Sequence, residues 1–230
     1  MNLAALIIHH RTQSNCVESD GFCPGWIADN WQRYTHPFWQ HVYLTIIAVV
    51  IGFAIAAGMA LVAHRRRWLV PPITSITGIL YTIPSLSLFF LLQPVTGRGN
   101  TTALVALVSY TLLIIFRNVL TGLDNVPPEA RDAARGLGMT ERQLLWQVEV
   151  PLAMPEIMAG LRVATTTTVG LATLAFFAGA GGLGGTLFSD LTFKSNVIVA
   201  GGLCVLLAVL LDLIILGAQR ALTPWRRATA

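Results

Sequence analysis

The stretch "DAARGLGMTERQLLWQVEVP" (132–151) lies between two long apolar segments, and the interpretation of the whole fold depends on it. Charged residues recur along it, so it is too polar to enter a bilayer. Its helix-favouring pattern is also too regular for a passive linker. The surrounding sequence must therefore indicate which compartment this stretch faces and what it contacts.

The composition indicates an integral membrane protein. Apolar residues make up 54% of the 230 residues and charged residues 11%, whereas soluble domains contain about 25% charged residues. The apolar residues fall into blocks close to the length that crosses about 30 Å of hydrocarbon. The net charge of +4 does not indicate nucleic acid binding, because the basic residues cluster at the ends of these blocks and form no single surface.

We expect an all-α fold with five transmembrane helices, since each of five apolar blocks can cross a bilayer at about 1.5 Å per residue. The blocks lie at about 41–63, 69–92, 102–121, 152–178 and 197–219. The second block is interrupted by Pro71, Pro72 and Pro84.

The basic residues predict that the N-terminus is outside and the C-terminus inside. Ten arginines then fall on the inner side: Arg65, Arg66, Arg67, Arg117, Arg131, Arg135, Arg142, Arg220, Arg226 and Arg227. Four basic residues fall outside: Arg11, Arg33, Arg98 and Lys194. The stretch at 132–151 is therefore expected to be cytoplasmic.

Three regions are expected: an extracytoplasmic or interfacial segment at 1–40, a transmembrane domain at 41–222 and a cytoplasmic tail at 223–230. The transmembrane domain includes a cytoplasmic loop at about 124–151. Cys16 and Cys23 could form a disulfide if the first segment faces an oxidising compartment. The aromatic residues of that segment could lie along the outer membrane interface or contact another protein, and the sequence leaves both alternatives open.

The first half of the loop, "VPPEARDAARGLG" (126–138), predicts a short helix. Pro127 and Pro128 suit its first turn, where a missing N–H costs nothing. A face of small residues is expected at helical spacing. Its members are Ala130, Ala133, Ala134 and Leu137. Gly138 suits a left-handed helix end, which other residues enter at a cost of roughly 1–2 kcal/mol.

The second half, "TERQLLWQV" (140–148), predicts another helix, for which Thr140 is a suitable cap. Its apolar side consists of Leu144, Leu145 and Val148. Pro151 is expected to end this helix where the fourth span begins. Two short helices joined at a glycine could fit a groove on another protein or pack on their own bundle, and the residues alone leave both open.

The spacing in this loop resembles a family motif that reads Glu-Ala-Ala, three residues, Gly, nine residues and Ile-x-Leu-Pro. Here it appears as Asp132-Ala133-Ala134, Gly138 and Val148-Glu149-Val150-Pro151. The loop is similar to the coupling loop of permease subunits of bacterial ABC importers, with Asp for Glu and Val for Ile and Leu as departures. In that family the loop docks on the ATPase subunit. The resemblance implies a coupling role for Glu129, Asp132, Ala133, Ala134, Gly138, Leu144, Leu145, Val148 and Pro151.

Three further stretches resemble the osmoprotectant branch of these permeases. They are "YTIPSLSLFFLL" (81–92), "LLIIFRNVLTGL" (112–123) and "FFAGAGGLGGTLF" (176–188). That branch takes up glycine betaine, choline, carnitine and related quaternary amines. The resemblance implies transport of such solutes across the bacterial cytoplasmic membrane by alternating access. Methionine permeases share part of the pattern, so another small solute is the alternative.

The expected partners follow from what the sequence lacks. It contains no G-x-x-x-x-G-K-[ST] pattern, so the chain is not expected to be an enzyme, and ATP and Mg²⁺ should bind to a partner ATPase. The resemblance implies a second permease chain, identical or paralogous, and an extracytoplasmic substrate-binding protein. Membrane lipids are expected around the spans, and neither nucleic acid nor a metal site is expected.

The candidate translocation path or gate consists of aromatic, proline and glycine residues near the span ends, together with one acid. These residues are Tyr81, Pro84, Ser85, Tyr110, Phe176, Phe177, Gly179, Gly181, Gly182 and Asp212. The aromatic residues could line a weak path for a quaternary amine or simply pack. The glycines could break the fourth span or permit close packing. Gly179, Gly181 and Gly184 match G-x-G-x-x-G, but this spacing is not taken for a dinucleotide site because an apolar span precedes it.

Asp212 is the one acid well inside a span, where an unpaired carboxylate costs roughly 2.5–3.5 kcal/mol. It could line the path or pair with Arg117 or Arg162. A stand-alone channel would not need the loop, and a membrane enzyme should show more His, Cys or acidic residues inside the spans. Both alternatives are therefore less favoured than a permease.

Overall fold

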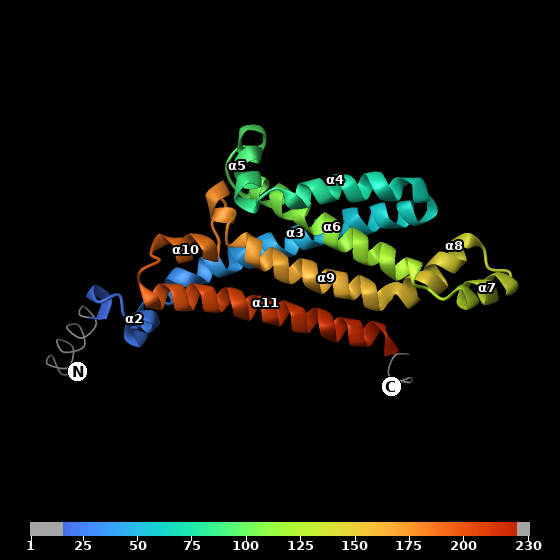
Figure 1. Cartoon of the computed structure of the whole chain (residues 1–230). Helices are drawn as coiled ribbons and strands as arrows, with labels where there is room; N and C mark the ends of the chain where they lie inside the picture. The colour runs from blue at the N-terminus through green and yellow to red at the C-terminus, as the bar shows by residue number, and fades with distance from the viewer. Residues whose placement is uncertain (1–15, 225–230) are drawn as a thin grey trace.

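The computed structural model describes residues 16–224, and this part of the chain contains helices and no strand (Figure 1). In chain order the elements are α2 (Pro24–Asp29), α3 (Gln32–Arg65), η1 (Arg67–Leu69), α4 (Val70–Thr82), α5 (Ser85–Thr96), α6 (Asn100–Asp124), α7 (Pro128–Gly136), α8 (Glu141–Leu144), η2 (Leu145–Glu149), α9 (Val150–Ala172), η3 (Ala175–Ala178), α10 (Leu183–Ser189) and α11 (Lys194–Leu222). Residues 1–15 of the predicted first segment and 225–230 of the predicted tail lie outside the described residues.

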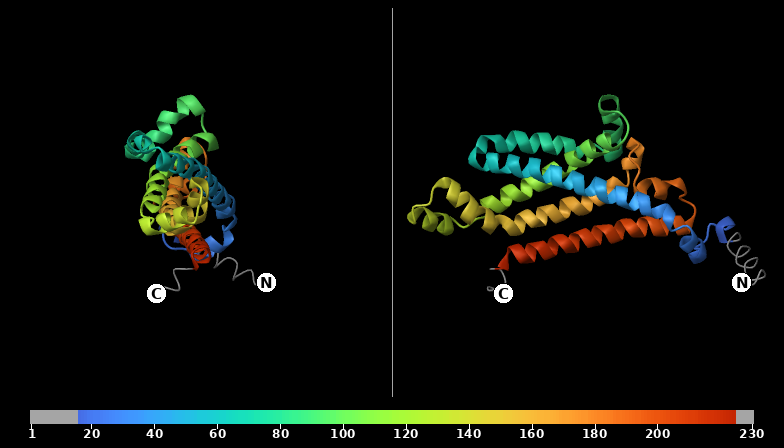
Figure 2. Two further views of the ribbon diagram at one scale, coloured as in Figure 1. Left: turned by 90° about the vertical axis from the view of Figure 1, so that its right-hand side faces the viewer. Right: turned by 180° about the vertical axis from the view of Figure 1, so that it is seen from behind.

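Four long helices, α3, α6, α9 and α11, run side by side, with α4 beside α3 and α6 (Figures 1 and 2). Helices α7 and α8 project from one end of this bundle, which we call the loop end. Helix α2 lies at the opposite end, and α11 finishes toward the loop end. The start and finish of the described chain thus lie toward opposite ends of the bundle.

Three helices of the described chain, α3, α6 and α11, are long and apolar enough to cross a membrane. Helix α9 has 23 residues but is less apolar, because it contains Glu156, Arg162 and a run of four threonines. It nevertheless packs between α6 and α11, with its inner face buried. The first predicted span begins earlier than expected, since α3 starts at Gln32.

The second predicted span is a bent pair, α4 and α5, with an angle of 100° between its halves. Pro71 and Pro72 lie in the first turn of α4 and do not interrupt it, so only Pro84 breaks the span. Ile83 and Pro84 are extended, with ψ values of 128° and 132°. Proline disfavours helical geometry at the residue before it and cannot donate to a helical hydrogen bond, which explains the break.

The prediction that the fourth span reaches 178 is wrong, since α9 ends at Ala172. Thr173 N–H donates to Gly170, so the helix tightens at its end, and the separate turn η3 follows. Gly179 then adopts a left-handed conformation with φ of +84°. The segment after Ala172 therefore leaves the path of α9 before the predicted end, although it stays mostly apolar.

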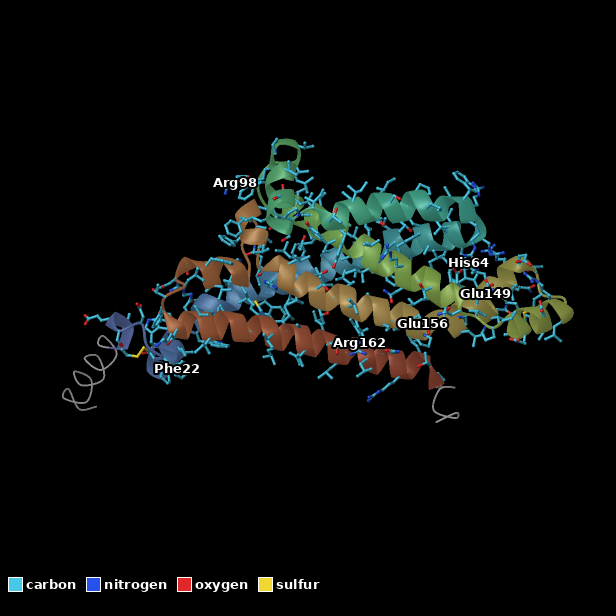
Figure 3. All side chains as sticks on the ribbon, in the orientation of Figure 1. Phe22, His64, Arg98, Glu149, Glu156 and Arg162 are labelled. Carbon is cyan, nitrogen blue, oxygen red and sulfur yellow. A yellow bond between two sulfur atoms is a disulfide. The ribbon has the colours of Figure 1, made fainter. Side chains whose placement is uncertain are left out.

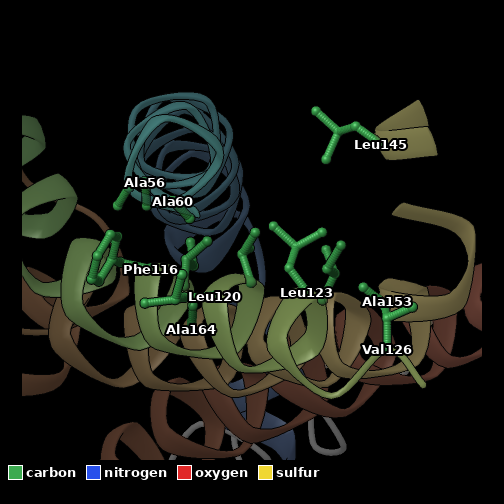
Figure 4. Packing of buried hydrophobic residues seen from close by; sticks show 13 residues of the cluster. Ala56, Ala60, Phe116, Leu120, Leu123, Val126, Leu145, Ala153 and Ala164 are labelled. Atoms are coloured by element: carbon green, nitrogen blue, oxygen red, sulfur yellow. The ribbon is translucent and has the colours of Figure 1, made fainter. Parts of the chain in front are cut away.

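Small residues on α3 bring its backbone close to α6 (Figure 4). Ala56 and Ala60 are buried against Phe116 and Leu120 of α6, and Ala164 of α9 closes the same cluster. The buried small residues of α3 are Ala48, Gly52, Ala56, Ala60 and Ala63. A Cβ atom at Gly52 would overlap the side chain of Thr111 on α6, so this side chain lies directly against the backbone of α3.

The segment before α3 is attached to the start of α11. Cys16 and Cys23 form a disulfide, with 6.0 Å between their Cα atoms, so the suspected bond is present (Figure 3). Cys23 N–H donates to Ser195 Oγ at 2.7 Å, and the hydroxyl of Tyr34 donates to Asn196 Oδ1 at 3.1 Å. These contacts order the segment at the end of the bundle opposite the loop.

Candidate functional site

The first loop helix has the predicted boundaries. Pro127 is its N-cap in extended geometry, Pro128 begins α7, and Glu129 provides an acidic first turn. Gly138 adopts a φ of +78°, and its N–H donates to Arg135 at 2.9 Å. The prediction of a left-handed end at Gly138 is therefore confirmed.

The second loop helix begins with a capping box. Gln143 N–H donates to Thr140 Oγ1, and Thr140 N–H donates to the Gln143 side chain at 2.8 Å, so two unpaired helix donors are satisfied. Thr140 was predicted as a cap, whereas Gln143 was missed although Thr-x-x-Gln is a recognisable capping pattern. The loop conformation is thus determined locally by a glycine and a cap.

The prediction that Pro151 ends the second helix is wrong. Helix α8 continues through a π-helical turn, η2, into α9, and Pro151 lies in the first turn of α9. A π turn pairs residues five apart and is often found at functional sites, and here it precedes a proline that lacks a donor. The loop is consequently continuous with α9 as one helical rod.

The loop has a buried side and an exposed side. Leu144 and Leu145 are buried and Val148 is half-buried, as predicted for the apolar side. Of the predicted small face, Ala134 is buried and Ala133 is exposed. Leu137 lies beyond the end of α7 and is 79% exposed. The exposed residues on the outer side are Asp132, Ala133, Leu137, Gly138 and Trp146.

A buried carboxylate, Glu149, joins the second half of the loop to α7 and to α3 (Figure 3). Its side chain is 6% exposed and lies on η2. Arg131 of α7 pairs with it at 2.9 Å, and Nε2 of His64 on α3 lies 3.3 Å from it. Nδ1 of His64 in turn lies 3.3 Å from Asp124 at the end of α6, and Arg67 pairs with Asp124 at 2.7 Å.

A second, exposed set of ion pairs links α8 to α3. Arg65 donates to Glu141 at 2.8 Å, and Arg135 of α7 donates to the same carboxylate at 3.3 Å. These two arginines hold the pKa of Glu141 below its ordinary value. Between the two sets lies an open cavity of about 380 Å³, lined mainly by charged side chains.

The sequence did not reveal these pairs. Arg65 and Arg67 were used only as evidence for orientation, and Glu149 occupies the unspecified position of the family motif. His64 and Glu149 are 85 residues apart, so no local spacing connects them. The one available signal was charge. Asp124 and Glu149 are acidic residues near the two ends of the predicted loop, and basic residues lie at the end of the first predicted span.

The candidate gate glycines lie in a broken segment between η3 and α10. Gly179, Gly181 and Gly182 have φ values of +84°, +76° and +86°, so the backbone changes direction at these residues. Gly184 instead permits close packing, because a Cβ atom there would overlap the carbonyl of Thr173. Both roles considered for this glycine cluster are therefore present, at different positions.

We call residues 173–182 the glycine segment. Carbonyl groups within it and just before it accept hydrogen bonds from three other helices. Nε2 of His41 on α3 lies 3.0 Å from the Val169 carbonyl, and Gln40 of α3 donates to the Ala180 carbonyl. Gln93 of α5 donates to Phe177 at 3.1 Å. The N–H of Gly99, at the start of α6, donates to Ala178 at 2.7 Å.

The predicted aromatic residues form two separate groups. Tyr81 and Tyr110 have ring centroids 5.9 Å apart beside the α4–α5 break, where the Tyr110 hydroxyl donates to the Ile83 carbonyl. Phe176 and Phe177 lie 3.9 Å apart and contact Phe188 of α10. Pro84 makes the break and Ser85 begins α5. The residues are therefore not brought together into one cage.

Asp212 on α11 pairs with Arg162 on α9 through two hydrogen bonds of 2.7 Å (Figure 3). Of the two arginines suggested as partners, Arg162 is the one used. The pair joins the two helices and accounts for the acid inside the span, while its role in a path stays a prediction. Within residues 16–224, no three His, Cys, Asp or Glu residues are grouped to hold a metal ion.

The chain is similar in sequence to known transport proteins. Residues 37–228 match the family model described as binding-protein-dependent transport system inner membrane component. The chain is 37% identical over 188 residues to the choline transport system permease protein OpuBB of Bacillus subtilis (strain 168), covering 81% of this chain and 87% of that protein. It is 38% identical over 192 residues to the osmoprotectant import permease protein OsmW of Salmonella typhimurium (strain LT2), covering 80% and 89%.

Solved structures share the fold. The inward-facing MetNI methionine ABC transporter matches with a TM-score of 0.70 at 22% identity, over 87% of this chain and 100% of that one. An amino acid ABC transporter with histidines matches with a TM-score of 0.65 at 19% identity, over 84% and 97%. At these identities the likeness concerns the arrangement of helices and not the solute.

Proposed function

Since this chain belongs to the family of binding-protein-dependent transport system inner membrane components, we propose that it carries osmoprotectants of the quaternary-amine class. It is an inner-membrane permease subunit of an ABC importer. The observation that carries the solute class is the identity of 37–38% to permeases named for choline and osmoprotectants, over four fifths of the chain. Glycine betaine, choline and carnitine are the solutes to test, with methionine as the alternative.

The chain crosses the membrane five times, with α3, the bent pair α4–α5, α6, α9 and α11 as the crossings. The N-terminus is outside, and the loop end is cytoplasmic. Two observations support this orientation. The loop end carries most of the arginines. The disulfide between Cys16 and Cys23 lies at the opposite end, which suits an oxidising compartment on that side of the membrane.

The exposed side of the loop docks on a separate ATPase subunit, which binds ATP and Mg²⁺. Ala133, Leu137, Gly138 and Trp146 are exposed there and make a small projecting surface. Leu144, Leu145 and Val148 position that surface from beneath, because they pack toward the bundle. Glu129 adds negative charge in the first turn of α7, where a helix N-terminus stabilises it, and Asp132 adds a further exposed negative charge to the same helix.

A complete transporter contains two permease chains, identical or paralogous, and an extracytoplasmic binding protein delivers the solute. Many apolar side chains of α11 are exposed in this single chain, which suits contact with lipid or with a second permease. Tyr81, Tyr110, Phe176 and Phe177 line a transit path of low affinity, because ring faces attract quaternary ammonium groups. Weak binding of the solute in this path would allow its release on the other side.

The test is uptake of radiolabelled glycine betaine, choline, carnitine and methionine by cells that express this chain with its ATPase, second permease and binding protein. The loop variant Asp132→Lys/Gly138→Trp, at matched expression, is the control. We expect uptake of at least one quaternary amine by the wild type, at least tenfold lower uptake by the variant, and no methionine uptake. Methionine uptake alone would overturn the solute class and leave the permease class intact.

A further inference from the structure

Helix α3 contacts both the coupling loop and the glycine segment, although neither adjoins it in sequence. Gln40 and His41 lie toward one end of this helix, and His64 and Arg65 lie at the other. The helix continues without interruption between them, so at about 1.5 Å per residue His41 and His64 are about 35 Å apart. No other helix of the described chain is bonded by side chains to both sites in this way.

At the loop end, α3 is bonded to the second half of the loop, at α8 and η2, and to the end of α6. His64 bridges Glu149 and Asp124, and its side chain is only 8% exposed. Arg65 donates to the Glu141 carboxylate and to the backbone carbonyl of the same residue. A displacement of α8 and η2 therefore displaces this end of α3 unless these polar contacts break, and the one to Glu149 is buried.

At the other end, two consecutive side chains of α3 hold the backbone around the glycine segment. Gln40 donates to the Ala180 carbonyl and accepts from Gly182 N–H at 3.3 Å. His41 is fully buried and lies against the Val169 carbonyl, near the end of α9. A Cβ atom at Gly181 would lie 2.6 Å from the side-chain oxygen of Gln40, and the φ of +76° at this position favours glycine.

Between its ends α3 is well placed to shift as a unit. Its buried side between these ends is formed mostly by alanines and Gly52, and the Thr111 side chain of α6 fits against Gly52. Packed helices of this kind slide by small rigid shifts, and a helix transmits such a shift along its length because its hydrogen bonds are internal. The glycine segment is the responsive part, since its positive φ values give it few helical hydrogen bonds.

We propose that α3 mechanically links the coupling loop to the glycine segment. Glu149 and His64 are the positioning residues at the loop end, and Gln40 and His41 are the positioning residues at the other. Movement of the loop, driven by the partner ATPase, reaches the glycine segment through α3 as well as through α9. This inference rests on the proposed function for the source of the movement, and it assigns the glycine segment to the outward gate.

The test is a double-mutant cycle in the complete transporter, reconstituted in liposomes, with solute moved per ATP hydrolysed as the readout. The variants are Glu149→Gln, Gln40→Ala and the pair. Sites this far apart normally act additively. We expect each single variant to lower the ratio about tenfold, and the pair to be no worse than the poorer single variant, because both interrupt one link.

Gln93→Ala is the matched control, since Gln93 also donates to the glycine segment but from α5. When Gln93→Ala is combined with Glu149→Gln, the fold-losses in solute moved per ATP hydrolysed should multiply. The proposal is overturned if both pairs are additive or if both are non-additive. Copurification with the ATPase establishes that every variant assembles, and a variant that does not assemble is replaced by Glu149→Asp or Gln40→Asn.

A second readout needs no transport. A spin label at Leu191→Cys, an exposed position after α10, reports whether ATP changes the environment at the end of the helix that directly follows the glycine segment. We expect an ATP-dependent spectral change in the wild type that Glu149→Gln abolishes and that Arg142→Gln, an exposed change on α8, retains. Persistence of the change in Glu149→Gln would overturn the link. Absence of glycine betaine transport would leave this arm intact and count only against the proposed solute.

Discussion

His64 of α3 lies 3.3 Å from Glu149 of η2, and both side chains are less than one tenth exposed. This contact joins residues that are 85 positions apart and attaches the loop to a helix that is not its neighbour in sequence. Arg131 approaches the same carboxylate from α7, so the buried negative charge has two partners. The loop is therefore fixed to the bundle on its inner side and free on its outer side.

Gly138→Ala should loosen the loop, because its φ of +78° is a conformation that residues with a Cβ enter at a cost of about 1–2 kcal/mol. The matched change Gly136→Ala should be neutral or stabilising, since Gly136 ends α7 and has open space around it. Hydrogen exchange of amides at 133–145 measures the opening, which we expect to rise roughly 5–30-fold in Gly138→Ala only. Equal exchange in both variants would contradict the assignment.

Asp212→Leu should lower the temperature of thermal unfolding, because it removes two charge-assisted hydrogen bonds and leaves Arg162 without its partner. The double change Arg162→Met/Asp212→Leu should recover most of the loss, since no charge then lacks a partner. Thermal unfolding in detergent measures both. Transport by the recovered double variant distinguishes the two suggested roles: normal uptake argues for a structural pair, and lost uptake argues for a place in the path.

The long helices and the two loop helices could be predicted from the sequence, because apolar blocks, prolines and Gly138 act locally. The break at Pro84 could also be predicted, because proline acts locally on the backbone. The early end of α9 could not be predicted, because the residues from Thr173 to Ala178 remain mostly apolar and only hydrogen bonds with other helices define their path. The π turn before Pro151 was also missed, because a proline normally signals a helix end.

The interior polar residues were harder to predict than the apolar ones. Gln40, His41 and His64 lie near the ends of an apolar block, where polar residues are expected at a membrane interface and carry no further signal. Their partners lie on distant segments, and for Gln40 and His41 these partners are backbone carbonyls, which no side-chain pattern records. The candidate path residues were found by residue type, yet the structure divides their aromatic members between two places.

The disulfide should report the orientation of the chain. In intact cells, Cys16 and Cys23 should react with a membrane-impermeant maleimide only after reduction, because they are bonded to each other. Cys204 should not react in either state, since it is buried within α11. The mass of the alkylated protein measures the number of labels. Failure of both thiols to react after reduction would place this segment inside and contradict the proposed topology.

The contact between Arg65, Glu141 and Arg135 should depend on pH in the acid range only. The arginines lower the pKa of Glu141 from its ordinary value of 4.5, so the folded loop binds a proton less readily than the unfolded one. The contribution to loop stability is then fully present above pH 4.5 and is lost as the pH falls through the lowered pKa. Hydrogen exchange of amides at 139–146, corrected for the intrinsic effect of pH, should show the loss. Glu141→Gln removes the titrating group, so its corrected exchange should stay flat over the same range. A flat profile in the wild type would mean that Arg65 and Arg135 do not hold α8 through this carboxylate.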